Sequence, residues 1–242
     1  MPKPLALTLG EPAGIGPDIT IAVWARRAEL KLLPFYVLGD PRFLARRAAQ
    51  LGLTVPVAAV TASEADAAFA SALPVVDTGV PVTAEPGKPD ASSAPAAIAA
   101  IRQAVADVVA GSAAAMVTNP VAKNVLYRSG FAEPGHTEFL GKLAGEFLGV
   151  SARPVMMLWA PELAVVPVTI HLPLAEVPGA LDFELIVETG RIVERDLRKR
   201  FGIARPRLAV AGLNPHAGEN GALGGEDLAI VAPAVQRLVA EG

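Results

Sequence analysis

The chain contains three histidines, and two of them follow apolar runs of strand length. His171 comes directly after the run 163–170, and His216 follows shortly after the run 207–213. In open α/β sheets ligands bind beyond the carboxyl ends of the strands, so both imidazoles are predicted where chemistry would take place. Neutral imidazole is a common ligand for zinc and other divalent metals. Because two histidines do not define a metal site, a shared metal and two ordinary loop residues both stay open.

His136 lies in a different setting, directly before a predicted helix in the segment PGHTEFL at 134–140. Thr137 is expected to cap the N-terminus of that helix. A helix start offers free N–H groups and a partial positive charge to an anion, and the His136 ring and the Thr137 hydroxyl would add donors. The pattern therefore predicts a phosphate or carboxylate site, with a plain helix cap beside a surface histidine as an equal alternative.

Two further segments follow predicted strands. The loop GEPAGIGPD at 10–18 lacks the glycine spacing of a dinucleotide-binding fingerprint and contains two prolines, so it indicates a substrate loop or a structural loop. The segment TNPVAK at 118–123 brings a hydroxyl, an amide and an ammonium together. An anion-contact loop and an ordinary Asn-Pro turn explain it equally well.

Alternating strands and helices must position these segments. Short apolar runs alternate with longer stretches of helical period, which predicts an α/β fold with a mostly parallel sheet. A lobe boundary is expected in the loop near 118–125, which divides the chain into lobes 1–121 and 122–242. Strands are expected at 5–9, 35–38, 55–60, 73–76, 113–117 and 207–213, with an antiparallel hairpin at 154–159 and 163–169. Helices are expected from 17, before 52, at 92–110, at 137–149, at 181–201 and from 226 onward.

Composition excludes several classes of protein. Of 242 residues, 52% are hydrophobic, which is enough for a sizeable core and too many for a disordered chain. A formal charge of -3 favours neither nucleic acid nor an anionic membrane as a partner, and the lack of cysteine excludes disulfides and thiolate metal sites. No signal-peptide core or membrane-length apolar run is visible, which predicts a cytoplasmic protein. The basic run at 195–200 is typical of a solvated helix end.

Together these segments resemble the 4-hydroxythreonine-4-phosphate dehydrogenase family of pyridoxal phosphate biosynthesis. The resemblance extends from about residue 5 to the end of the chain, and its motifs keep the order and spacing of the family. They are GEPAGIGPD at 10–18, TNPVAK at 118–123, GHTEFL at 135–140, IHLPL at 170–174 and GLNPHAGENGALGGED at 212–227.

The resemblance implies an isocitrate/isopropylmalate-dehydrogenase-like fold of two α/β lobes, a homodimer, and an active site between the lobes. It implies that His171 and His216 bind a divalent metal (Zn, Mg or Co) and that His136 and Thr137 contact a small phosphorylated substrate. The implied reaction is the NAD- or NADP-dependent oxidation of 4-phosphohydroxy-L-threonine to a 3-oxo acid, which decarboxylates to 3-amino-2-oxopropyl phosphate. A metal on the hydroxyl oxygen would stabilise the developing alkoxide.

Members of this family continue past the point that corresponds to Gly242. Their further residues supply a third metal histidine, an acidic metal contact from the neighbouring subunit, and more substrate contacts. Two imidazoles are few ligands for a tight metal site, so the activity of these residues alone stays open. Ala122 also stands where some relatives have histidine. The alternatives are a paralogue that oxidises another phosphorylated hydroxy acid (threonate or erythronate phosphate) and a non-catalytic protein that binds a phosphorylated ligand.

Overall fold

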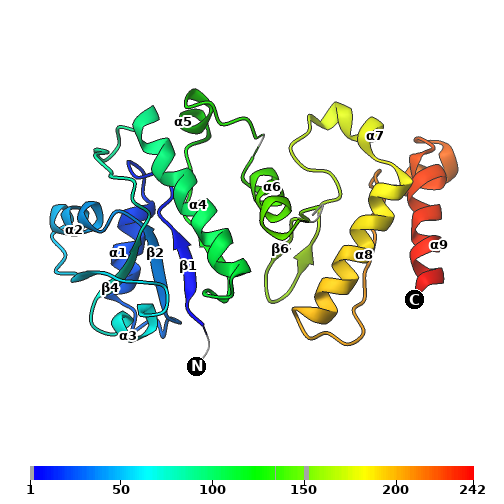
Figure 1. Ribbon diagram of the computed structural model, residues 1–242. Helices are drawn as coiled ribbons and strands as arrows, with labels where there is room; N and C mark the ends of the chain where they lie inside the picture. The colour runs from blue at the N-terminus through cyan, green and yellow to red at the C-terminus, as the bar shows by residue number, and fades with distance from the viewer. Residues whose placement is uncertain (1–2, 134, 150–152) are drawn as a thin grey trace. The chain divides into compact units, whose positions relative to one another are not determined.

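The computed structural model describes residues 3–133, 135–149 and 153–242 (Figure 1). Contacts divide the chain into two compact units, Met1–Arg153 and Pro154–Gly242. This division falls later than the lobe boundary expected at 121/122, because the helices α5 (Lys123–Arg128) and α6 (His136–Leu148) pack within the first unit. The expected lobes 1–121 and 122–242 therefore do not coincide with the compact units.

The first unit is built on a five-stranded sheet in which all pairs of neighbouring strands are parallel, in the order β3-β4-β2-β1-β5. β2 is buried along its whole length, which explains why its sequence is continuously apolar rather than alternating. The sheet confirms the predicted α/β fold. Its strands are β1 (Leu5–Thr8), β2 (Phe35–Gly39), β3 (Val57–Ala59), β4 (Leu73–Asp77) and β5 (Met116–Thr118).

Helices connect these strands and cover the sheet. α4 lies along β1 and β2, and α6 packs on α4 (Figure 1). Prolines stand in the first turns of α1, α2 and α4, where the missing N–H costs nothing. Asp40 caps α2 by accepting a hydrogen bond from the backbone N–H of Arg42 at 2.8 Å. The helices are α1 (Gly16–Ala25), α2 (Pro41–Gln50), α3 (Ala65–Phe69) and α4 (Ala94–Val109), the last preceded by the 3₁₀ turn η1 (Ala91–Ser93).

The core of the first unit lies between the sheet and these helices. Its largest fully buried side chains include Tyr36, Ile21, Leu38 and Leu44. A buried polar group of this core is paired within the protein: the indole N–H of Trp24 donates to the carbonyl oxygen of Phe69 at 3.1 Å. A core of this kind gives the loops at the carboxyl ends of β1 and β5 a rigid support.

The second unit is mainly helical. α8 and α9 pack against each other around Ile186, Val187 and Val231. The predicted hairpin is present but short, since only two residues of each strand pair, antiparallel. The elements are β6 (Leu158–Trp159), β7 (Ala164–Val165), η2 (Leu174–Glu176), α7 (Val177–Ala180), α8 (Phe183–Lys199), η3 (Ala217–Gly221), the π-helical turn η4 (Asp227–Val231) and α9 (Ala232–Glu241).

The strand predicted at 207–213 is wrong. The segment has no regular secondary structure and pairs with no strand in the part of the chain that the structure describes, and Leu208 and Val210 are exposed. The prediction of a full strand at 163–170 is also wrong, because only Ala164–Val165 forms a strand within that run. An apolar run of strand length forms a strand only where a neighbour supplies hydrogen-bonding partners.

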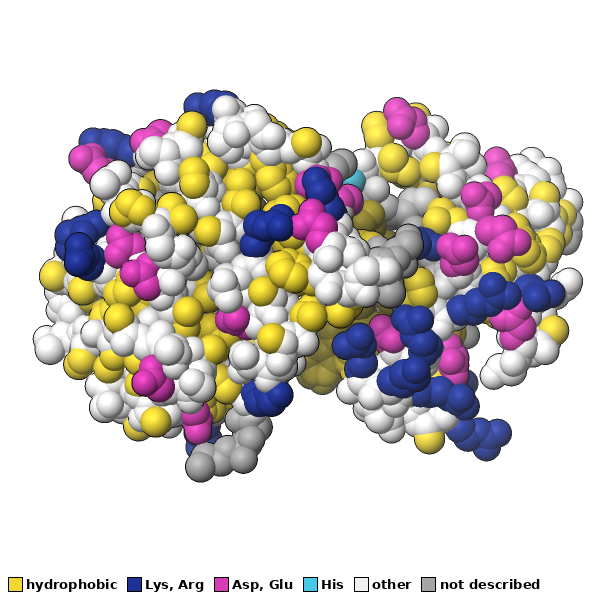
Figure 2. Space-filling view, in the orientation of Figure 1, with side chains coloured by type: hydrophobic (Ala, Val, Ile, Leu, Met, Phe, Trp, Pro, Cys, Tyr) yellow, Lys and Arg dark blue, Asp and Glu magenta, His cyan; other side chains and the backbone are white. Residues whose placement is uncertain are grey.

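The basic end of α8 is a solvated surface, as predicted. Dark-blue side chains gather toward that end of the helix in Figure 2. Arg198 lies 2.8 Å from Glu194 and Arg200 lies 3.4 Å from Asp196, so part of the positive charge is balanced along the helix itself. Across residues 3–133, 135–149 and 153–242, no helix is both long and apolar enough to cross a membrane.

Candidate active site

His136 is the first residue of α6, in the first unit. The helix is capped by Gly135, whose backbone is extended with φ -163° and ψ 179°, and no side chain bonds to the cap. The prediction that Thr137 is the N-cap is therefore wrong: Thr137 stands inside the first turn. The left-handed Gly149 ends the helix, as expected. Among the described residues no side chain caps α6, so the N–H groups of its first turn can be bonded by a ligand beside His136 and Thr137.

A small pocket forms where α4, α5 and the start of α6 meet. It has room for about one water molecule, and Lys123 and His136 both line it together with Leu126 and Phe139. Nε2 of His136 and Oε2 of Glu138 are buried without a hydrogen-bond partner among the described residues. A buried polar atom without a partner is costly, so this ring is well placed to gain a partner from a ligand.

The charge state of His136 follows from its surroundings. Burial, and secondly the ammonium of Lys123, lower the pKa of His136 below its ordinary value of 6.5. The imidazole is therefore neutral at pH 7 in the ligand-free chain and can donate one hydrogen bond. An arriving phosphate would meet a cation and this donor.

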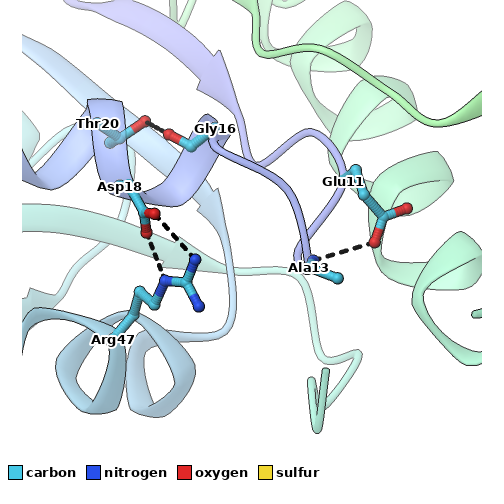
Figure 3. A network of polar contacts seen from close by, with 6 residues as sticks. All are labelled: Glu11, Ala13, Gly16, Asp18, Thr20 and Arg47. Atoms are coloured by element: carbon cyan, nitrogen blue, oxygen red, sulfur yellow. Dashed lines mark hydrogen bonds and ion pairs between the residues drawn. The ribbon is translucent and has the colours of Figure 1, made fainter. Parts of the chain in front are cut away.

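The glycine-rich loop 10–18 is held by its own polar contacts (Figure 3). The buried carboxylate of Glu11 accepts a hydrogen bond from the backbone N–H of Ala13 at 3.0 Å. Asp18 pairs with the buried guanidinium of Arg47 on α2, with its Oδ2 2.9 Å from Nη2. These contacts indicate a rigid loop rather than a mobile flap.

His171 and His216 both belong to the second unit, and both are exposed. His171 has a left-handed backbone, with φ 58°, and does not directly follow a strand, contrary to expectation. His216 precedes Ala217, Glu219 and Asn220, which also have positive φ. Backbone in this region is strained for residues other than glycine and is concentrated at functional loops.

The loop that carries His216 is fixed by hydrogen bonds from within its own motif. The backbone N–H of His216 donates to Oδ1 of Asn214 at 2.8 Å. Nδ1 of His216 lies 3.1 Å from Oε1 of Glu219, an arrangement that leaves Nε2 to face outward. The buried Asp227 accepts hydrogen bonds from the N–H groups of Leu213 and Asn214.

The described residues contain no cluster of three or more His, Cys, Asp or Glu side chains able to hold a metal ion. His171 and His216 as metal ligands, and His136 and Thr137 as substrate contacts, therefore stay predictions. The sequence did not reveal that Lys123 and His136 line one pocket, nor the role of Asp227. The motifs TNPVAK and GLNPHAGENGALGGED contained both residues, but only the tertiary structure shows what they contact.

The chain is similar to known proteins over almost its whole length. The family profile described as "Pyridoxal phosphate biosynthetic protein PdxA" matches residues 31–242. A relative from Bradyrhizobium diazoefficiens named 4-hydroxythreonine-4-phosphate dehydrogenase is 63% identical over 99% of this chain and 72% of its own length. A relative of the same name from Xanthobacter autotrophicus is 58% identical, over 100% of this chain and 69% of its own length.

Solved structures agree with these relatives. The crystal structure of a 4-hydroxythreonine-4-phosphate dehydrogenase from Burkholderia phymatum superposes with a TM-score of 0.83 at 32% identity, covering 100% of this chain and 72% of that one. Sequence, motif order and fold thus lead to one family. The chain belongs to the family of the pyridoxal phosphate biosynthetic protein PdxA.

Proposed function

We propose that this chain is a 4-hydroxythreonine-4-phosphate dehydrogenase. It oxidises 4-phosphohydroxy-L-threonine with NAD or NADP, in the pathway to pyridoxal phosphate. The observation that carries the proposal is the 63% identity, over 99% of the chain, to a relative of that name. The site supports it as well, because the Nε2 atom of His136 at the start of α6 is buried without a hydrogen-bond partner among the described residues.

The substrate phosphate is proposed to bind at the start of α6. The free N–H groups of the first helical turn, the Thr137 hydroxyl and the ring of His136 would all donate to its oxygens. The nearby Lys123 adds positive charge. Phosphate binding would in turn favour the protonated imidazole and raise the pKa of His136, because the anion offsets the cost of burying a cation.

A divalent metal is proposed on His171 and His216, and the residues described here fit it only in part. Two exposed imidazoles supply suitable nitrogen donors, and Glu219 can orient the ring of His216. They form no cluster of three donors within the described part of the chain. We therefore derive no step of the reaction through the metal.

The oxidation removes a hydride from C3 of the substrate and a proton from its 3-hydroxyl. A bound nicotinamide supplies the hydride acceptor. The resulting 3-oxo acid then loses carbon dioxide and takes up a proton to give 3-amino-2-oxopropyl phosphate. The contribution proposed for this chain is to hold the phosphate at His136 and Thr137, so that the reacting carbon is presented in one orientation. A homodimer is the expected assembly.

The test is turnover by the purified chain with 4-phosphohydroxy-L-threonine, NAD or NADP, and Zn²⁺, Mg²⁺ or Co²⁺, followed by the absorbance of reduced nicotinamide. Thr137→Val and His136→Asn should raise KM, and His216→Ala should abolish metal-dependent turnover. Lys142→Ala is the matched control, because it removes a cation from α6 that pairs with Glu133 at 2.7 Å and lies outside the pocket.

Two outcomes would contradict the proposal. Turnover of threonate or erythronate phosphate in place of the threonine substrate would identify a paralogue. Binding of the phosphorylated substrate without reduction of either nicotinamide would identify a binding protein. Light scattering on the same sample would test the dimer.

A further inference from the structure

Asn119 joins the carboxyl ends of two neighbouring strands, β1 and β5. Its side chain is buried, and its Nδ2 donates hydrogen bonds to the carbonyl oxygen of Thr8 at 3.0 Å and to Oγ1 of Thr20 at 2.9 Å. Its backbone N–H donates to Oγ1 of Thr8 at 3.3 Å. Both hydrogens of the amide are thus engaged inside the protein, which leaves them unable to contact an anion.

Two glycines of the loop 10–18 make room for Asn119. A Cβ atom on Gly10, whose φ is +72°, would lie 2.6 Å from Cβ of Asn119, and one on Gly16 would lie 2.9 Å from it. Carbon atoms do not approach so closely, so a side chain at either position would displace Asn119. The loop and the turn are also joined through the backbone, because the N–H of Glu11 donates to the carbonyl oxygen of Pro120 at 2.8 Å.

Thr20 extends this connection into α1. Its hydroxyl accepts the hydrogen bond from Asn119 and donates its own hydrogen to the carbonyl oxygen of Gly16 at 2.9 Å (Figure 3). Thr20 is buried, like Asn119 and Thr8. The turn after β5 is therefore tied to both β1 and α1 by buried hydrogen bonds, which favour one conformation of the turn.

The fixed turn leads directly into α5, whose first residue is Lys123. Lys123 lines the same pocket as His136. Val125 and Leu126 pack the body of α5 against Ala94 and Ala97 of α4. The direction in which the chain enters α5, and with it the place of Lys123, depends on the turn at Asn119 and Pro120.

We infer that Asn119 is a positioning residue, which fixes the turn 118–122 and thereby holds Lys123 beside His136. It acts through Lys123 and contacts no substrate itself. This inference rests on the proposed function only for its effect on turnover. The placement of Lys123 beside His136 can be tested without any substrate.

The first experiment titrates the three histidines by NMR in the ligand-free chain. Lys123→Met removes the cation and should raise the pKa of His136. Asn119→Ala and Thr20→Val should also raise the pKa of His136, because Lys123 is then no longer held in place. Asn119→Ala should add nothing in a chain that already carries Lys123→Met. Thr20→Ser keeps the hydroxyl and should restore the native value, and His171 and His216 serve as internal references.

Tyr36→Phe is the matched control for a loss of stability alone. It deletes the buried hydrogen bond from the Tyr36 hydroxyl to Oδ2 of Asp107, 2.6 Å long, in the same unit. It should lower stability without moving the pKa of His136. The inference is overturned if Asn119→Ala and Thr20→Val, like Tyr36→Phe, lower stability and leave the pKa of His136 unchanged. Should Asn119→Ala fail to fold, the smaller change Thr20→Val decides the question.

The second experiment measures turnover of 4-phosphohydroxy-L-threonine. Asn119→Ala should raise KM by about tenfold, the size expected for one charge-assisted contact, while kcat changes far less. A tenfold fall in kcat with an unchanged KM would contradict the role of Asn119 in placing Lys123. If the native chain shows no turnover, the proposed function fails, and the titration still decides the placement of Lys123.

Discussion

Asp227 holds the backbone of Leu213: its Oδ1 accepts the N–H of that residue at 2.8 Å, and its Oδ2 accepts the N–H of Asn214 at 3.1 Å. Asp227 is buried and is the first residue of the π-helical turn η4. It thereby fastens the start of the loop that carries His216 to the helical part of the second unit.

Asp227→Ala should therefore loosen this loop. Two partly buried N–H groups lose their acceptor, at a cost of about 2 kcal/mol in the free energy of unfolding. Native-state hydrogen exchange should show faster exchange at Leu213 and Asn214. Asp182→Ala is the control, because Asp182 caps α8 by accepting the N–H of Leu185 at 2.7 Å and does not contact the loop. Equal exchange at Leu213 in both variants would refute the clamp.

The ion pair between Asp18 and Arg47 supports the second prediction. The side chain of Arg47 is 4% exposed and that of Asp18 is 32% exposed. Asp18→Asn leaves a buried guanidinium without its counter-charge and should cost about 3 kcal/mol of stability. The double variant Asp18→Asn/Arg47→Met should recover most of this loss, as measured by urea denaturation.

An exposed pair provides the comparison. Arg26 and Glu29 have side chains that are 59% and 63% exposed, and Glu29→Gln should produce no measurable change. Were Asp18→Asn equally harmless, the pair would have no role in joining α1 to α2.

The parallel sheet could be predicted from sequence because its central strands are short apolar runs. β2 is continuously apolar because it is buried along its whole length, whereas β1 and β4 are buried over part of theirs. The segment 207–213 has the same apolar character but no neighbouring strand in the described part of the chain. Whether an apolar run pairs with a neighbouring strand depends on tertiary structure. The apolar character of 207–213 therefore predicted a strand that does not form.

The site was predictable only in outline. The position of His136 at a helix start followed from the segment that precedes it, but glycine replaced the expected Thr137 as the cap. The proximity of Lys123 to His136 requires α5 and the start of α6 to meet beside α4, which no local spacing reveals. The part played by Asn119 was likewise hidden, since Asn-Pro is also the signal for an ordinary turn.

Tyr36 gives a prediction for alkaline pH. Burial, and secondly its hydrogen bond to Asp107, raise the pKa of Tyr36 well above its ordinary value of 10.0. A raised folded-state pKa contributes stability that is present below the unfolded value and is lost as the pH rises above it. Wild-type stability, measured by urea denaturation, should therefore fall more steeply above about pH 10 than that of Tyr36→Phe. Parallel profiles would mean that the phenol is not held in its neutral form.

His136 gives the opposite dependence, in the acidic range. Its folded-state pKa is lowered by burial and by Lys123, so the unfolded chain binds the proton more tightly than the folded chain. The contribution to stability is then present above the unfolded pKa of about 6.5 and is lost as the pH falls through the folded value. Between about pH 7 and pH 5 the wild type should lose more stability than His136→Asn, which cannot titrate there. Adding inorganic phosphate should reduce the difference, because a bound anion favours the protonated ring. Equal loss in both proteins would show that the ring is as well solvated when folded as when unfolded, and the reason for placing a ligand beside Nε2 would disappear.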